Sequence, residues 1–301
     1  MSSLFLGELA ALGAAVCFTF GPTMFTLAGR RVGSLTVNRF RLLLASLFLL
    51  LLHFVFYGQP YPALDGRIWG YLFLSGVIGL AISDVFLFEA FVRIGPRLAL
   101  LVLNLVPVAT TAVAWVLFGE HLTGGELAAI AVTLAGVSWV VAERPLNDDG
   151  TIRAHDPRGL LFAFAAVGLQ TVSTLLAKGG MMAGIPAVSG NVVRMSGGVL
   201  ALWLWTLLKG EAGSTLRVAW ERPRVLGIIA AGVAIGPVLG ITLSLFALKV
   251  IPVGIVSTLG SLTPVLLIPV SRWVFHERVS LRAVWGTLLA TAGVAWLLLM
   301  G

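Results

Sequence analysis

The sequence contains little charge. Of its 301 residues, 11% are Asp, Glu, Lys or Arg and 58% are hydrophobic, and the mean hydropathy is +1.02. Soluble globular domains are about 25% charged and about 45–50% apolar. A chain of this composition cannot keep its apolar surface from water by folding on itself, so we expect an integral membrane protein. Ten helices of about 20 residues would use about 200 residues, which leaves too little chain for a large extramembrane enzyme domain.

The sequence also lacks the motifs that several function classes require. The single cysteine, Cys17, cannot form an internal disulfide. The four histidines are scattered, with no HExxH pair and no paired carboxylates, which argues against an enzyme, a metal site or a cofactor. The absence of a G-x-x-x-x-G-K-[ST] loop argues against an ATP-driven pump. The net charge of +7 comes from basic loops between apolar segments, which points to membrane orientation and not to nucleic acid.

Apolar segments of helix-spanning length follow one another along the chain, separated by short Gly, Pro or charge clusters. We predict ten transmembrane helices at residues 4–28, 36–57, 68–92, 97–118, 124–142, 159–183, 188–208, 225–248, 254–275 and 281–300. The first segment is too long for a signal-peptide core and has no basic residue before it, so we expect a retained helix.

The two halves of the sequence resemble each other. FGEHLT at 118–123 matches FHERVS at 275–280, at a separation of 157 positions. Further pairs at 157 or 153 positions are Gly136 with Gly293, Pro107 with Pro264, Asn38 with Asn191, and Arg41 with Arg194. These matches predict a duplicated five-helix unit.

The duplication divides the chain into a first repeat at 1–142, a polar linker at 143–158 and a second repeat at 159–301. Five helices per unit would insert the second copy in the opposite orientation. The basic connections of both halves then fall on one face of the membrane, which the positive-inside rule makes cytoplasmic. We therefore expect an all-α, multi-pass protein of the plasma (inner) membrane, with two inverted five-helix repeats and both termini non-cytoplasmic.

In these features the chain resembles the drug/metabolite transporter superfamily, and within it the ten-helix EamA-type carriers. The resemblance rests on the two F-x-E-x-[LV]-[TS] elements, on the paired prolines, and on FEAFVRIGP at 88–96 opposite LFALKVIPVG at 245–254. It covers residues 5–142 and 159–299. It implies a central cavity lined mainly by the first, third and fourth helices of each half, with the fifth outside. It also implies export of small metabolites or xenobiotics without ATP.

An inverted repeat is typical of secondary transporters, whose halves rock to expose a midplane site to each side in turn. The expected function is therefore movement of small organic metabolites, such as amino acids, related compounds or drugs, across the lipid bilayer. Coupling would be to protons, to another solute or to the substrate's own gradient. The alternative is a non-transporting membrane scaffold or sensor. The sequence gives no signal of the oligomeric state.

Charged residues inside apolar spans are functional candidates, because each costs about 2.5–3.5 kcal/mol on insertion scales. Asp84 is expected either to bind a substrate ammonium or take up a proton, or to be a structural partner of Arg41 or Arg194. The two arginines are expected either to snorkel toward lipid phosphates or to gate the cavity. Glu89 lies four residues before Arg93, which is the spacing of a helical ion pair.

Uncharged polar residues in the expected cavity helices are candidate substrate contacts, with helix–helix hydrogen bonding as the alternative. They are Thr19, Thr23, Asn104, Thr110, Thr111, Gln170, Ser173, Thr174, Thr242, Ser244, Ser257, Ser261 and Thr263. Lys178 is a further candidate, with snorkelling as its alternative. Pro107 and Pro264 are expected to be hinges, with static bends as the alternative.

Overall fold

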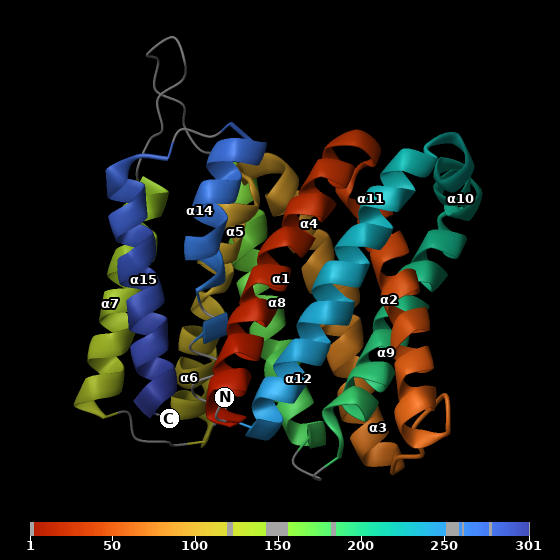
Figure 1. The fold of residues 1–301 in the computed structure, drawn as a ribbon, viewed down its shortest axis with the longest axis horizontal. Helices are drawn as coiled ribbons and strands as arrows, with labels where there is room; N and C mark the ends of the chain where they lie inside the picture. Colours follow the sequence, from red (N-terminus) through yellow and green to blue (C-terminus); the bar gives the residue numbers. More distant parts are fainter. Residues whose placement is uncertain are drawn as a thin grey trace.

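The structure is a computed structural model that describes residues 3–118, 123–142, 156–181, 185–250, 259–260, 262–276 and 279–300. Every regular element within these residues is a helix, and most of the helices stand side by side along one direction (Figure 1). Seven helical runs in the described part are long and apolar enough to cross a membrane. The prediction of an all-α membrane protein is confirmed at this level.

The helices of the first half agree closely with the segments predicted from hydropathy. They are α1 (Ser3–Val32), α2 (Ser34–Tyr57), α3 (Gly66–Gly76), η1 (Val77–Ser83), α4 (Asp84–Ile94), α5 (Pro96–Leu103), α6 (Leu105–Phe118) and α7 (Gly124–Ala142). The third predicted segment is one continuous run of α3, η1 and α4. The fourth is broken at Asn104, between α5 and α6.

The second half begins at Pro157, two residues before the predicted start of the second repeat, and most of the predicted linker lies outside the described residues. Its helices are α8 (Pro157–Met181), α9 (Ala187–Leu208), α10 (Ala212–Glu221), α11 (Pro223–Val233), η2 (Ala234–Gly240), α12 (Ile241–Val250), α14 (Thr263–Val274) and α15 (Leu281–Met300). The helix α10 lies in a stretch that hydropathy assigned to a connection. This helix has 10 residues of mixed charged and apolar character, which is too short to span a membrane.

A π-helical segment recurs at the same place in the two halves. η1 starts at Val77 and η2 at Ala234, and these positions are 157 residues apart, the same separation as the sequence repeat. The flanking helices correspond as well, α3 with α11 and α4 with α12. Short π segments widen a helix and are frequent at functional sites. The sequence analysis did not predict them.

The helices α7 and α15 form a closely packed pair at one edge of the molecule (Figure 1). A Cβ on Gly136 would lie 2.3 Å from the amide nitrogen of Ala290, and a Cβ on Gly293 would lie 2.4 Å from Oγ1 of Thr133. Thr133 and Ala290 are themselves 157 positions apart. The two glycines therefore make equivalent contacts: Gly136 faces Ala290, and Gly293 faces Thr133, the repeat counterpart of Ala290.

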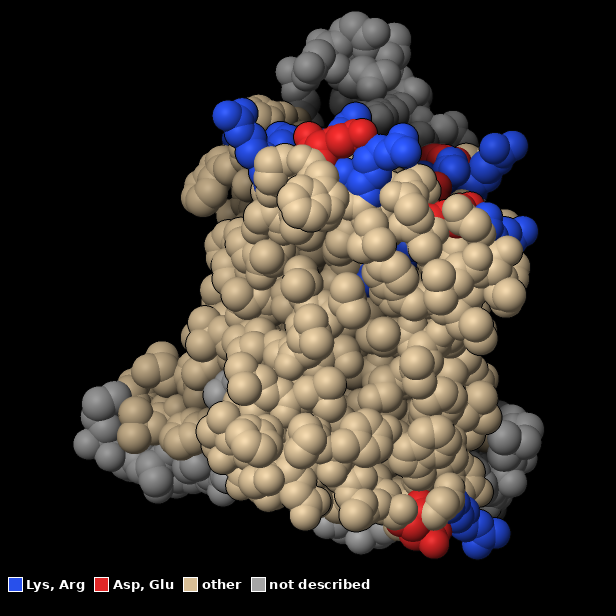
Figure 2. All heavy atoms as spheres, turned by 90° about the vertical axis from the view of Figure 1, so that its right-hand side faces the viewer, with Lys and Arg blue, Asp and Glu red and all other residues tan. Residues whose placement is uncertain are grey.

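Charged residues gather at the two ends of the molecule, with a broad band of other residues between them (Figure 2). The richer end carries Arg30 and Arg31 at the end of α1, and Arg222 and Arg224 at the start of α11. The opposite end carries Arg67 near the start of α3. Both chain termini lie toward this second end (Figure 1).

The short helix α10 is fixed to the richer end by a buried arginine of α2. Nη1 of Arg39 donates to Oγ1 of Thr215 at 2.7 Å, and its Nη2 forms an ion pair with the Glu211 carboxylate. Trp220 at the other end of α10 is 88% exposed. A short helix held by the polar contacts of one arginine, with an exposed tryptophan near Arg217, fits the headgroup level of a membrane.

Candidate functional site

A cavity of about 630 Å³ lies between the two halves of the chain. Its volume is within the range of about 300–1,000 Å³ typical of small-molecule sites. The resemblance implied a lining from the first, third and fourth helices of each half. The structure adds the second helices, because Arg41 of α2 and Asn191 and Arg194 of α9 also line the cavity. None of the described lining residues comes from α7 or α15, as expected for helices that lie outside.

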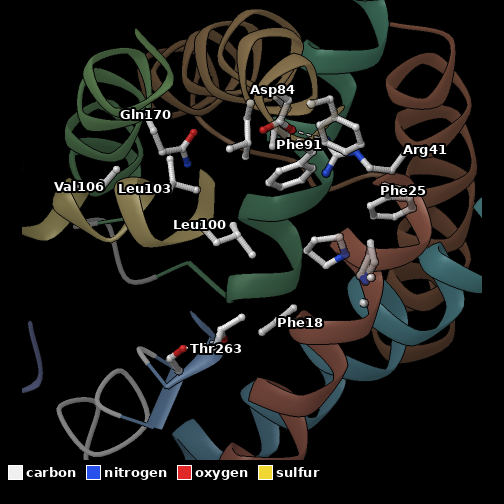
Figure 3. Close-up of a pocket in the computed structure, with 18 of the residues that line it drawn as sticks. Phe18, Phe25, Arg41, Asp84, Phe91, Leu100, Leu103, Val106, Gln170 and Thr263 are labelled. Carbon is white, nitrogen blue, oxygen red and sulfur yellow. Dashed lines mark hydrogen bonds and ion pairs between the residues drawn. The ribbon is translucent and has the colours of Figure 1, made fainter. Parts of the chain in front are cut away.

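The centre of the cavity wall is an ion pair between α2 and α4. Nη2 of Arg41 donates to Oδ2 of Asp84, and the two side chains point toward each other in Figure 3. Nε of Arg41 donates to Oδ1 of Asn38 at 3.2 Å, and the guanidinium lies 5.1 Å from the Phe88 ring centroid. Asp84 is 7% exposed. This carboxylate is therefore buried and directly neutralised by one cation.

Arg194 enters the same cavity from α9 and has much weaker contacts. Its Nη2 lies 3.4 Å from Oγ of Ser173, beyond the usual N–H···O range. Its Nε is buried and has no hydrogen-bond partner in the described part of the chain. Asp84 acts on it electrostatically, but no ion pair joins the two. The guanidinium is therefore only partly compensated.

Arg41 and Arg194 are the counterparts that the sequence repeat identified, yet the acid is not duplicated. The position equivalent to Asp84 in the second half is Ile241, which also lines the cavity. Two repeated cations thus converge on one anion. The alternative that the arginines snorkel to headgroups is wrong, because both side chains are held inside the bundle.

The remaining lining is largely apolar, with a few polar groups. Phe25, Phe88 and Phe91 form an aromatic cluster, with centroid separations of 5.5 Å and 5.3 Å between neighbouring rings. In Figure 3, Gln170 and Arg41 lie on opposite sides of Asp84. The described uncharged polar side chains of the lining are Asn104, Gln170, Thr174, Asn191 and Thr263.

Backbone irregularities border the cavity in both halves. Leu80 of η1 and Pro237 of η2 are repeat counterparts and both line it. The carbonyl of Leu80 accepts from the Asn38 amide at 3.3 Å, which ties the first π segment to the helix that carries Arg41. Pro264, in the first turn of α14, removes the backbone donor that would reach Gly260. Oγ1 of Thr263 donates to that carbonyl at 2.8 Å instead.

Several predicted site residues have other roles. Thr19 and Thr23 are buried, but their hydroxyls donate to carbonyls of their own helix, at Ala15 and Thr19, and neither lines the cavity. Ser173 exchanges hydrogen bonds with Ser75 of α3, so it joins α8 to α3. The contacts of these three hydroxyls agree with the alternative of hydrogen bonding within and between helices.

Other predictions agree with the structure or fall outside it. Nε of Arg93 lies 2.8 Å from Oε1 of Glu89, which confirms the predicted helical ion pair. Pro264 and Thr263 line the cavity. The side chains of Thr111, Thr242, Lys178 and Pro107, and the whole of Ser257 and Ser261, lie outside what the structure describes.

The signal for Asn191 was present but not used. The sequence comparison paired it with Asn38, and it lies three residues before Arg194, which places both on one helical face. The aromatic lining carried no distinguishing signal, because phenylalanines occur throughout the spans. Among the described residues, no three His, Cys, Asp or Glu side chains come together as metal ligands do.

Comparison with known families identifies the architecture around this cavity. The model of the EamA-like transporter family matches residues 5–142 and again residues 157–299. The chain belongs to the EamA-like transporter family. Two consecutive matches confirm the repeat, and EamA proteins are transporters and not, in general, enzymes.

The fold also recurs among solved structures. One, titled "Crystal structure of protein", superposes with a TM-score of 0.62 at 18% sequence identity. The match covers 98% of this chain and 96% of the other, so the similarity extends over nearly the whole of both chains. At this identity the comparison shows the fold alone. A comparison with curated proteins found no match.

Proposed function

We propose that the protein is a secondary transporter that moves small organic metabolites through the central cavity by alternating access. The cavity between the two EamA repeats carries this proposal, because both repeats contribute polar and charged side chains to a single site. Amino acids and related compounds fit its mixture of apolar and charged groups, and drugs of similar size fit its volume.

The proposed mechanism requires two inverted five-helix repeats, and ten transmembrane helices in total. Gly136 faces Ala290, and Gly293 faces Thr133, which is the repeat counterpart of Ala290. Reciprocal contacts of this kind are expected when a two-fold axis relates the two repeats, so they support this arrangement. The second helices α2 and α9 also pack on each other, as do α7 and α15. Rocking of one repeat against the other would then expose the cavity to each side in turn.

The proposed direction is export across the inner (plasma) membrane, with both termini non-cytoplasmic. The basic end of the molecule supports this orientation through the positive-inside rule. In the first half a helix break lies at Asn104, before Pro107, and in the second half α14 begins at Thr263, directly before Pro264. Together with η1 and η2 they supply the bends about which such a movement would turn.

Asp84 is the group that we propose to couple transport to protons. Its protonation would release Arg41 and loosen the contact between α2 and α4 that the ion pair now makes. A structural role as a fixed partner of Arg41 is the alternative. The two roles differ in their effect on transport driven by a pH gradient.

Uptake into proteoliposomes tests the proposed function. A mixed pool of labelled amino acids is offered to vesicles with wild type, Asp84→Asn or the control Glu221→Gln, which changes an exposed acid on α10. We expect flux above protein-free vesicles, stimulated by an imposed pH gradient in the wild type and the control but not in Asp84→Asn. Equal stimulation in all three would leave Asp84 a structural role. No flux with amino acids or a broad metabolite panel would favour a scaffold or sensor.

A further inference from the structure

The charges that line the cavity do not balance. Of the described lining residues, Arg41 and Arg194 are cationic and Asp84 is anionic, so the wall carries one net positive charge. A buried charge without a partner is expensive, and proteins compensate it with a counter-ion or a ligand. The excess charge is located on Arg194, since Asp84 is already paired with Arg41.

The local contacts of Arg194 leave room for a ligand. A guanidinium carries five N–H donors in a planar fork that matches a carboxylate. Here Nε has no partner in the described residues, and Nη2 has only the long contact to Ser173. Asn191, one turn earlier on α9, faces the same cavity and adds an amide donor.

The rest of the wall selects the other part of the ligand. Phe18 and the cluster of Phe25, Phe88 and Phe91 present aromatic faces to the cavity. An aromatic or aliphatic remainder would bury apolar surface there. Among the described lining residues, Asp84 is the only carboxylate that a cationic group of the ligand could pair with, and it is already paired with Arg41.

We propose that Arg194 binds the carboxylate of an organic monoanion whose apolar part lies against the phenylalanines of the cavity. The proposal rests on the transport function proposed above and narrows its substrate class. It places the charge that selects the substrate on Arg194 of α9, and it gives the two repeated arginines different roles. Arg41 holds Asp84, and Arg194 holds the substrate.

Ligand-dependent thermal stability of the purified protein tests this site. The probe is 2-naphthoate, and its neutral isostere 2-naphthamide is the matched control. The variants are Arg194→Gln, Arg194→Lys and Arg217→Gln, the last of which removes an equal charge from the exposed surface of α10. A ligand that binds only the folded state raises the free energy of unfolding by RT ln(1 + [L]/Kd), so a tighter ligand gives a larger rise in melting temperature.

We expect 2-naphthoate to stabilise the wild type and Arg217→Gln, with 2-naphthamide at least tenfold weaker. Arg194→Gln should weaken naphthoate binding at least tenfold and leave naphthamide unchanged. Arg194→Lys should lose less, because it keeps the charge without the fork. It also keeps the test valid if Arg194→Gln does not fold.

A variant with the opposite expected effect excludes general damage to the fold. Asp84→Asn should bind 2-naphthoate at least threefold more tightly than the wild type, because it frees Arg41 and raises the net charge of the cavity. Equal binding of naphthoate and naphthamide, unchanged naphthoate binding in Arg194→Gln, or no stabilisation by naphthoate at all would overturn the proposal. Flux of amino acids or of the broad metabolite panel in proteoliposomes would separate that failure from a failure of the transport function.

Discussion

Gly76 of α3 is predicted to tolerate no side chain, because α3 and α9 meet there backbone to backbone. A Cβ at this position would lie 1.8 Å from the carbonyl oxygen of Arg194 and 2.6 Å from its carbonyl carbon. Gly70 is in the same helix, and a Cβ there would have nothing within 4 Å. Gly76→Ala and Gly70→Ala are therefore a matched pair: both add one methyl group to α3, but only the first adds it against the backbone of α9.

The expected cost follows from these distances. An ordinary contact of a Cβ atom is 3.4 Å or more, so the backbone of α9 must move by more than 1 Å to admit the methyl group. Overpacking of this kind costs about 1–3 kcal/mol, and a backbone neighbour favours the upper part of that range. Replacing glycine by alanine in a helix otherwise gains up to about 1 kcal/mol. Gly70→Ala should show that gain alone.

Thermal unfolding of the two purified variants, followed by tryptophan fluorescence in detergent, measures the difference. We expect Gly76→Ala to unfold at least about 4 °C below Gly70→Ala, since 1 kcal/mol corresponds to about 2–4 °C in a large domain. At temperatures where it stays folded, Gly76→Ala should also bind 2-naphthoate less well, because the shift moves Arg194. Equal stability of the two variants would refute the close approach of α3 and α9.

Three further predictions concern contacts away from this site. Arg41→Gln and Asp84→Asn should each lower stability by about 3–5 kcal/mol, and the double variant should cost less than the two together, because each single change strands a buried charge; additive unfolding free energies in a double-mutant cycle would contradict the ion pair. Gly136→Ala and Gly293→Ala should lower the melting temperature by similar amounts, since their Cβ atoms would meet α15 and α7 at 2.3 Å and 2.4 Å; a large difference would contradict the mutual contact. The hydrogen bond that Arg93 of α4 donates holds the pKa of Asp156 below its ordinary value, so the stability that this contact adds is present at neutral pH and is lost as the pH falls below about 4. If the melting temperature of Asp156→Asn fell in acid as much as that of the wild type, this contribution of Asp156 would be excluded.

The sequence was sufficient to predict most of the long apolar helices, because these depend on local composition, and the repeat, because matching residues recur at a constant separation. A span of about 20 apolar residues has few alternatives in a membrane. The pairing of Gly136 with Gly293 also had a direct structural meaning, since both lie in the contact of α7 with α15. The resemblance did not imply lining by the second helices, although a gate over the cavity was one of the two roles expected for Arg41 of α2 and Arg194 of α9.

The roles of individual polar residues were harder to predict, because they depend on side-chain direction. Thr19 and Thr23 have the composition of site residues, but a threonine in a helix can satisfy its hydroxyl on the preceding turn. Arg41 and Arg194 recur in the repeat, and only the structure shows that one is paired and the other nearly free. The π segments have no sequence signal of their own, since η2 contains a proline and η1 does not.

Access to the cavity from the two sides of the membrane tests the central claim most directly. In a Cys17→Ala background, Gln170→Cys places a single thiol on the cavity wall, and Trp220→Cys places one on the exposed surface of α10. Vesicles of known orientation are treated with a membrane-impermeant maleimide from either side. We predict that the thiol at position 170 reacts from both sides and that its modification stops flux, whereas the thiol at position 220 reacts from one side. Reaction at position 170 from one side under every condition, with flux unaffected by modification, would contradict transport through this cavity.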